Sequence, residues 1–216
     1  MTIQDAQAAQ PVIIVSGLPR SGTSMLMQML DAAGIPILSD GLRTADESNP
    51  RGYLEYEPVK KLASDNRWVS AAGGKAVKII LQLLPHLPAG VPVKVLFLNR
   101  PVEEVVESQN MMLQRLGRKI PADPAILIAT FQKQQQAALE FLKQRPSTSV
   151  LEVSQKKLIA RDADQIQQMA AFLNLSPEAV PAMLAAIDPS LNRVSKTTVR
   201  PEVPPRNGDL PGKVAK

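Results

Sequence analysis

The feature that most constrains the fold is a continuous β-branched run that leads directly into a glycine-containing turn. Residues 12–24 read VIIVSGLPRSGTS. An unbroken apolar run of this kind predicts a buried strand of a parallel sheet, here over Pro11–Val15. Helical composition follows over Ser24–Ala33, and Gly34 is a suitable helix stop. The turn Gly17–Thr23 is therefore expected to connect a buried strand to a helix.

A turn in this position can hold an anion. The segment from Gly17 to Ser24 fits the frame GxxxxG followed by hydroxyl-bearing residues. Glycines let successive backbone N–H groups converge, and the helix that follows adds its partial positive end. Arg20 supplies a cation within the turn, and Thr23 and Ser24 supply hydroxyl donors. We therefore expect a phosphate or sulfate group at this turn.

The turn lacks a residue that hydrolysis of ATP or GTP normally requires. Nucleoside triphosphatases have a lysine where this chain has Thr23. In addition, no acidic residue ends a nearby apolar strand as an obvious magnesium ligand, because VLFLN ends in Asn99 and Glu152 lies inside VLEV. The expected anion site is therefore one that works without a metal.

The remainder of the chain alternates between apolar runs and helical patterns. Further strands are predicted at 35–38, 75–80, 91–98 and 149–153. Helices are predicted at 58–66, 101–117, 123–143, 155–160, 163–173 and 177–187. This alternation predicts an α/β fold, a three-layer sandwich in which helices flank a parallel sheet, of the type found in P-loop nucleoside triphosphate hydrolases. We expect a flexible leader at 1–10, a single domain over 11–198 and a proline-rich extended tail over 199–216.

Composition narrows the classes of function. The chain of 216 residues has no cysteine and a single histidine, His86, which excludes thiolate and histidine-rich metal sites. Its net charge of +5 favours a small polyanionic ligand, but the 3% of aromatic residues are too few for a base-stacking surface, so no nucleic acid is expected. The N-terminal segment has neither the basic region nor the apolar core of a signal peptide, and no apolar run is long enough to span a membrane. A cytoplasmic location is the expectation.

At the turn the chain resembles the sulfotransferase family, whose members take a sulfuryl group from 3′-phosphoadenosine 5′-phosphosulfate (PAPS). The residues PRSGTS match the family's loop PxSGT[ST], which grips the 5′-phosphosulfate, and Arg20 within GLPRSGTS is similar to the branch that includes tyrosylprotein sulfotransferases. A second match is LFLNRPVEEVVES, whose Arg100 and Ser108 stand where the family binds the 3′-phosphate. A third is the strand and helix VLEVSQKKLI followed by MAAFLNLS. The resemblance covers roughly residues 11–176 and implies a bacterial, metal-independent transferase with PAPS as co-substrate. It implies that the donor is bound by Gly17, Pro19, Arg20, Ser21, Gly22, Thr23, Ser24, Arg100 and Ser108.

The resemblance also implies the catalytic groups. Arg20 would stabilise the leaving phosphate, whereas His86, between two prolines, does not match the histidine base of the cytosolic enzymes. The arginine-loop branch uses a glutamate shortly after the first helix. NPRGYLE resembles the stretch NPxG[FY]xE of bacterial sulfotransferase-like proteins, which makes Glu55 the first candidate for the base and Glu47 the second. The acceptor, a hydroxyl or an amine on a small molecule, carbohydrate or peptide, is not identified by any residue.

The sequence alone leaves several alternatives open for the function and for single residues. The chain could instead be a nucleotide kinase or triphosphatase with a degenerate cradle, or a non-catalytic nucleotide-binding domain. Lys78 could point into the site or end an exposed strand, and Trp68 could stack on adenine or fill the core. Arg43 and Arg51 could contact an anionic acceptor or pair with the acids of their own loop.

Overall fold

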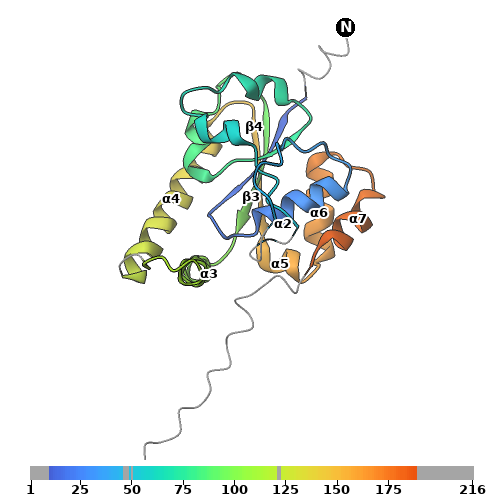
Figure 1. Cartoon of the computed structure of the whole chain (residues 1–216). Coiled ribbons are helices and arrows are strands. Elements are labelled where there is room, and N and C mark those ends of the chain that lie inside the picture. The colour runs from blue at the N-terminus through green and yellow to red at the C-terminus, as the bar shows by residue number, and fades with distance from the viewer. Residues whose placement is uncertain (1–9, 46–48, 50, 121–122, 189–216) are drawn as a thin grey trace, which may run out of the picture.

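A parallel sheet forms the centre of the molecule (Figure 1). The computed structural model describes residues 10–45, 49, 51–120 and 123–188. Within these residues the sheet has four strands in the order β2-β1-β3-β4, and all three neighbouring pairs are parallel. The strands are β1 (Val12–Gly17), β2 (Ala76–Lys78), β3 (Val93–Asn99) and β4 (Thr148–Ser154). The predicted strands at 75–80, 91–98 and 149–153 are confirmed by β2, β3 and β4.

Both faces of the sheet are covered, which explains why β1 has no polar-apolar alternation. All six residues of β1 are buried. Its side chains alternate between two cores, with Ile14 on one face and Ile13 and Val15 on the other. One face is covered by α3 (Val102–Arg115), α4 (Pro124–Gln144) and the short 3₁₀ helices η1 (Glu57–Lys61), η2 (Arg67–Ala72) and η3 (Leu81–His86). The opposite face is covered by α2 (Thr23–Ala32), α5 (Gln155–Ile159), α6 (Ala163–Leu173) and α7 (Ala179–Ala186).

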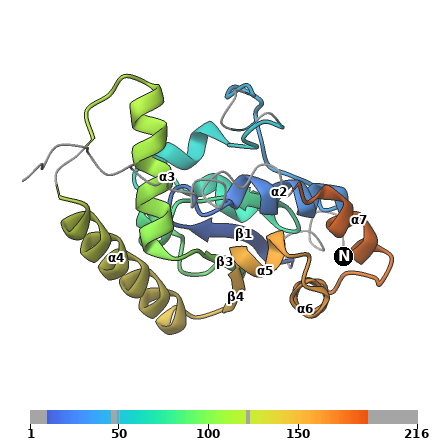
Figure 2. The same cartoon turned by 90° about the horizontal axis from the view of Figure 1, so that it is seen from below.

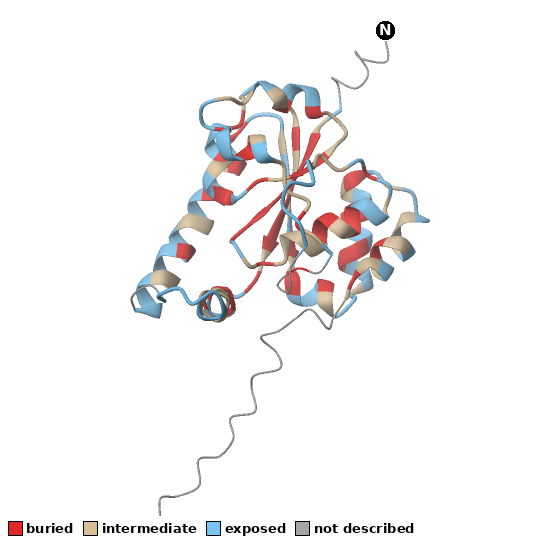
Figure 3. Cartoon of the chain, in the orientation of Figure 1, coloured by how far each residue is buried: buried red, intermediate tan, exposed pale blue. Residues whose placement is uncertain are grey.

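Figure 2 shows the resulting layers, with α3 and α4 on one side of the strands and α2, α5, α6 and α7 on the other. In Figure 3 the buried residues concentrate along the strands and on the inner sides of these helices. The predicted three-layer α/β sandwich is confirmed. Because each face of the sheet carries its own core, the polar ends of the strands are the part of the sheet left for a ligand.

The strand order places a switch point at β1. The chain leaves β1 to form β2 on one side and then crosses to form β3 on the other side. In a parallel sheet the crevice outside the carboxyl ends of two such strands is the usual place for a ligand. The register pairs Gly17 with Leu98, so the turn after β1 and the residues after β3 leave the sheet at the same level.

Two predicted elements are wrong. The strand predicted at 35–38 is reduced to one isolated bridge between Ile37 and Ala76, because Pro36 has no N–H to donate and interrupts the ladder. The helix predicted at 58–66 is only the 3₁₀ turn η1, and the polar side chains that follow compete for its backbone groups, as Ser64 does when its hydroxyl donates to the carbonyl of Lys61.

The other predicted helices are confirmed with small shifts at their ends. Pro101 precedes α3 as its N-cap residue, although the sequence places it at the first helical position. Residues 1–9 of the leader predicted over 1–10, the tail over 199–216 and the domain limit at 198 lie outside the described residues. Within the described ranges, no helix combines the length and the apolar character needed to cross a membrane.

Candidate functional site

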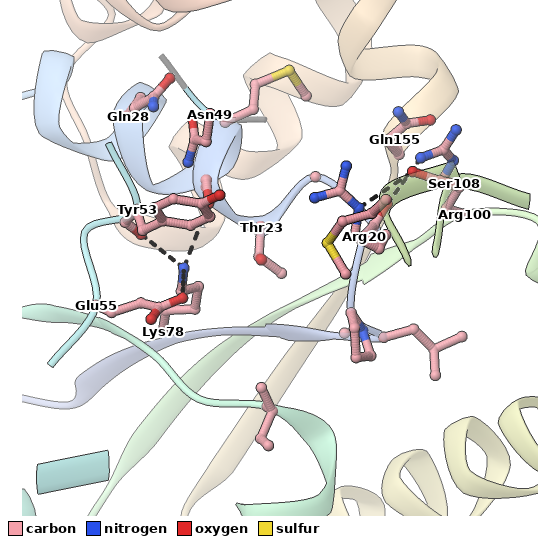
Figure 4. A pocket seen from close by; sticks show the side chains of 18 of the residues that line it. Arg20, Thr23, Gln28, Asn49, Tyr53, Glu55, Lys78, Arg100, Ser108 and Gln155 are labelled. Carbon is pink, nitrogen blue, oxygen red and sulfur yellow. Dashed lines mark hydrogen bonds and ion pairs between the residues drawn. The ribbon is translucent and has the colours of Figure 1, made fainter. Parts of the chain in front are cut away.

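A cavity of about 360 Å³ opens at the carboxyl ends of β1, β2 and β3 (Figure 4). Its wall is built from the turn after β1, the first turns of α2, the ends of β2 and β3, and α3 and α5, together with Arg43, Asn49, Tyr53 and Glu55. Of the predicted donor-binding residues, all but Ser21 line this cavity, and so does Glu55. The sequence-predicted residues are therefore brought together in one place.

The turn after β1 has a backbone that only particular residues adopt easily. Gly17 has φ of +153°, and a Cβ atom there would lie 2.7 Å from the backbone oxygen of Leu98 on the neighbouring strand. Gly22, the N-cap of α2, has φ of +97°, and Arg20 itself lies in the left-handed region at +67°. The turn is thus folded tightly against β3, which explains why glycine occupies these two positions.

Ser21 contributes to the shape of the turn. Its hydroxyl donates to the carbonyl of Leu18 at 2.7 Å, and its backbone N–H donates to the same oxygen at 3.2 Å. The side chain is fully buried. Both polar groups of Ser21 therefore point into the turn, while Thr23 and Ser24, the first residues of α2, face the cavity. The N-cap residue of α2 is Gly22, which has no side chain to cap the helix, so the first N–H groups of α2 are suited to a ligand or water.

Two arginines meet on one side of the cavity. Arg100, directly after β3, is 8% exposed, and its Nη1 donates to the backbone oxygen of Arg20 at 2.9 Å. The Nε of Arg20 donates to the hydroxyl of Ser108 on α3 at 3.3 Å. Arg20 belongs to the first sequence motif, and Arg100 and Ser108 belong to the second. The structure brings these two motifs into direct contact.

One side-chain nitrogen of Arg100 lacks a partner among the described residues. Its Nε donates to Glu104 of α3 at 3.2 Å, and Glu104 also pairs with Lys156 of α5 at 2.9 Å. Burial raises the pKa of Glu104, but Lys156 and then Arg100 outweigh burial and hold the pKa below its ordinary value. Within the described chain, the buried Nη2 of Arg100 has no hydrogen-bond acceptor. A buried cationic donor in this state is well suited to an anionic ligand.

A second charged group lies on the other side of Thr23 in Figure 4 and centres on Lys78, the last residue of β2. Its side chain is 9% exposed, and Nζ lies 3.0 Å from Oε1 of Glu55. Nζ also donates to the carbonyl of Tyr53 at 2.7 Å and to the hydroxyl of Ser24 at 3.4 Å. The sequence leaves open whether Lys78 points into the site or ends an exposed strand. In the structure, its side chain points into the site. Burial lowers the pKa of Lys78, against the opposing attraction of Glu55.

Glu55 is held between two cations. Arg43 donates to Oε1 of Glu55 at 2.8 Å, the same oxygen that pairs with Lys78, and its guanidinium lies 3.4 Å from the centre of the Tyr53 ring. Burial raises the pKa of Glu55, but Lys78 and then Arg43 outweigh burial, so the pKa lies below its ordinary value. Glu55 is therefore a carboxylate at neutral pH. Glu47, the second candidate for the base, lies outside the described residues.

Other residues considered from the sequence lie away from the cavity. His86 is exposed at the end of η3 and does not line the cavity. Trp68 packs against the core with its ring 5.2 Å from that of Tyr56, in an edge-to-face arrangement, and not in the cavity. Arg51 donates to the carbonyl of Ala186 at 2.6 Å and ties its loop to the end of α7.

Sequence reasoning missed Gln155, the first residue of α5. It is 4% exposed, it lines the cavity beside Arg100, and its Oε1 has no donor among the described residues. The signal was present, because Gln155 directly follows β4 and so stands at the carboxyl edge of the sheet. Among the described residues there is no cluster of three or more acidic, histidine or cysteine side chains that could hold a metal ion.

Comparison with solved structures assigns the fold. A sulfotransferase named STF1 from Mycobacterium tuberculosis aligns over 89% of this chain and 77% of its own, with a TM-score of 0.51 and 18% identity. The fold is that of a sulfotransferase. The sulfotransferase domains of the Synechococcus PCC 7002 olefin synthase and of the curacin biosynthetic pathway each align over 90% of the chain, and over 90% and 93% of their own lengths. Both have a TM-score of 0.49 and 15% identity. No protein-family model and no curated protein sequence matches the chain.

Proposed function

We propose that this protein is a sulfotransferase that moves a sulfuryl group from PAPS to a hydroxyl or amine acceptor. The observation that carries the proposal is the meeting of Arg20 and Arg100 in one cavity, beside the N-terminus of α2, with Nη2 of Arg100 buried and without an acceptor in the described chain. A donor with two separate anionic groups fits this arrangement. The 5′-phosphosulfate would lie on the turn and the 3′-phosphate on Arg100 and Ser108.

The reaction needs charge stabilisation and one proton acceptor. The acceptor oxygen or nitrogen forms a bond to sulfur while the bond between sulfur and the 5′-phosphate oxygen breaks, and negative charge grows on that leaving oxygen. Arg20, the N–H groups of the turn and the start of α2 are positioned to stabilise this charge without rearrangement. Because Arg20 is held by the Ser108 hydroxyl and by Arg100, its position is set before the donor arrives.

The second charged group supplies the remaining roles. Glu55, which is ionised at neutral pH and lines the same cavity, would take the proton that the acceptor loses. Lys78 lies between Glu55 and Ser24 and so stands where it can neutralise the oxygens of the transferring sulfuryl group. These roles do not use a metal ion, in agreement with the absence of a strand-end carboxylate at the turn.

The test is a calorimetric titration with 3′-phosphoadenosine 5′-phosphate, the donor product, and with ATP, each with and without magnesium. We expect the donor product to bind at least about tenfold more tightly than ATP, with no effect of magnesium. Magnesium-dependent binding and turnover of ATP would favour a kinase or triphosphatase. Tight binding of the donor product, without transfer from PAPS to any of a panel of alcohols, amines, sugars and tyrosine peptides, would make the chain a non-catalytic nucleotide-binding domain.

A further inference from the structure

Two buried polar atoms of opposite kind lie just after β3 and β4, and neither has a partner among the described residues. Nη2 of Arg100 is a donor without an acceptor, and Oε1 of Gln155 is an acceptor without a donor. The two residues are only 8% and 4% exposed. Because an unpaired buried polar atom is unfavourable, a cavity that contains two of them is expected to bind a ligand or ordered water at that place.

The sheet register places these two residues next to each other. Asn99, the last residue of β3, pairs with Ser154, the last residue of β4, and Arg100 and Gln155 are the residues that follow them. Both side chains line the cavity, and Figure 4 shows them on the same side of it. The unpaired donor and the unpaired acceptor therefore face one region of the cavity.

Contacts with two other segments hold the start of α5 in this position. Lys156, the residue after Gln155, pairs with Glu104 at 2.9 Å, and Glu104 pairs with Arg100 at 3.2 Å. Gln155 also packs against Gly22 of the turn after β1, where an added Cβ would lie 3.3 Å from Cγ of Gln155. The Gln155 side chain is thus in place beside the arginine cluster before any ligand binds.

We propose that Oε1 of Gln155 accepts a hydrogen bond from the 2′-hydroxyl of the ribose whose 3′-phosphate lies on Arg100, and so selects ribonucleotides. This inference rests on the proposed function, which puts that phosphate on Arg100 and Ser108, and it adds a specificity residue to the site. A 3′-phosphorylated ribose carries an anionic acceptor and a hydroxyl donor on adjacent carbon atoms, which complements the buried donor and acceptor. The amine of the base lies at the far edge of the purine.

The inference is tested by calorimetry with three nucleotides: 3′-phosphoadenosine 5′-phosphate, its 2′-deoxy analogue and inosine 3′,5′-bisphosphate. We expect the parent protein to bind the 2′-deoxy analogue about 5- to 10-fold more weakly than the ribose form, the size of one lost hydrogen bond that leaves a buried acceptor unpaired. The inosine nucleotide has an oxygen in place of the base amine, so it reports on any contact with the base.

Gln155→Met keeps the length of the side chain and removes the acceptor. It should weaken 3′-phosphoadenosine 5′-phosphate by about 5- to 10-fold and change the affinity of the 2′-deoxy analogue by less than about twofold, so that the preference for ribose disappears. The affinity ratio of the adenosine and inosine forms should equal that of the parent. Gln28→Met is the matched control, because Gln28 lines the same cavity but lies on α2 near Asn49 in Figure 4. It should keep the full preference for ribose.

Two results would overturn the inference while the proposed function stands: equal affinity of the parent for the ribose and 2′-deoxyribose forms, or a ribose preference that survives in Gln155→Met. The first comparison needs no variant, so it is decisive even if Gln155→Met does not fold. An adenosine preference over inosine that disappears in Gln155→Met, with the ribose preference retained, would assign Oε1 to the base amine.

The proposed function fails on different results. A ribose preference that depends on Gln155, without transfer from PAPS to any acceptor, would contradict the sulfotransferase proposal but not the role of Gln155. No binding of the bisphosphate by the parent protein would overturn both.

Discussion

At the scale of single residues, Arg20 is the side chain on which the proposed transfer depends most directly. It is the only arginine in the turn after β1, and the Ser108 hydroxyl and Arg100 both hold it in place. Its interaction with the leaving phosphate would strengthen as the bond to sulfur breaks, so it acts on the rate more than on donor affinity.

Arg20→Ala should therefore lower the rate of transfer from ³⁵S-labelled PAPS to a mixed acceptor panel by at least about 100-fold, the size of a lost transition-state donor. Thermal unfolding should stay within a few degrees of the parent protein. Arg118→Ala, at an exposed position after α3, is the control and should transfer at the parent rate. Normal turnover in the Arg20 variant would remove its catalytic role.

Glu55→Gln should destabilise the protein by about 1–3 kcal/mol at pH 7, because it leaves the buried Lys78 ammonium without its counter-charge. The folded-state pKa of Glu55 lies below its ordinary value of 4.5, so the carboxylate contributes stability above that value, which is lost as pH falls through the folded pKa. The difference between the two proteins in urea unfolding should hence shrink below pH 4.5.

The control for that experiment is Glu57→Gln, which breaks an exposed pair with Lys60 and should cost less than about 0.5 kcal/mol. A stability difference for Glu55→Gln that stays constant from pH 7 to pH 3.5 would show that the ion pair with Lys78 does not stabilise the folded state.

At the scale of elements, the turn between β1 and α2 is the piece most fully determined by sequence. Its strand, its helix and the positions of Gly17 and Gly22 could be predicted, because a run of buried β-branched residues and a positive φ are local requirements. The anion-binding role of Arg100 and Ser108 could be named only through a family resemblance. Their contact with Arg20 depends on the pairing of β1 with β3, which no local pattern encodes.

The positions of Lys78, Glu55 and Gln155 in the site were harder to predict for the same reason. The orientation of Lys78 depends on where Tyr53 and Glu55 lie relative to the end of β2, and Gln155 is oriented by the packing of α5. The wrong strand at 35–38 and the wrong helix at 58–66 are likewise cases where proline and polar side chains outweighed a short apolar pattern.

Gly17→Ala should remove the anion site. The added Cβ would meet the backbone oxygen of Leu98 and the hydroxyl of Ser21, so the turn must move away from β3. We expect a loss of about 1–3 kcal/mol of unfolding free energy, comparable to strain at such a backbone position, and at least a tenfold loss of affinity for 3′-phosphoadenosine 5′-phosphate. Gly90→Ala, where a Cβ meets nothing within 4 Å, should leave both unchanged. Unaltered nucleotide binding in the Gly17 variant would contradict this account of the turn.

At the scale of the whole molecule, the candidate site lies at the carboxyl ends of the strands, and the buried side chain of Arg145 lies at the opposite end of the sheet. Arg145, at the end of α4, is buried and donates to the carbonyls of Pro88 and Val91 at 2.5 and 2.8 Å and to the Thr148 hydroxyl at 2.8 Å. It joins the segments that precede β3 and β4. Stability and ligand binding should therefore be separable in this protein.

Arg145→Met should lower the unfolding free energy by about 2–4 kcal/mol, since several buried carbonyls lose a charged donor. Below the unfolding temperature, affinity for 3′-phosphoadenosine 5′-phosphate should be unchanged. Lys143→Met, on the exposed side of the same helix, should alter neither quantity. If nucleotide affinity fell together with stability in the Arg145 variant, the two ends of the sheet would not be independent.

The central claim is that the end of β3 holds a 3′-phosphate beside the cradle for the 5′ group, and Arg100→Gln tests it most directly. The measurement is a calorimetric comparison of 3′-phosphoadenosine 5′-phosphate with AMP, with Arg115→Gln on the exposed end of α3 as control. We expect Arg100→Gln to weaken the bisphosphate by about 10- to 100-fold, as for a lost hydrogen bond from a charged group, and AMP by less than threefold. An equal loss for both nucleotides, or no loss for either, would contradict the claim.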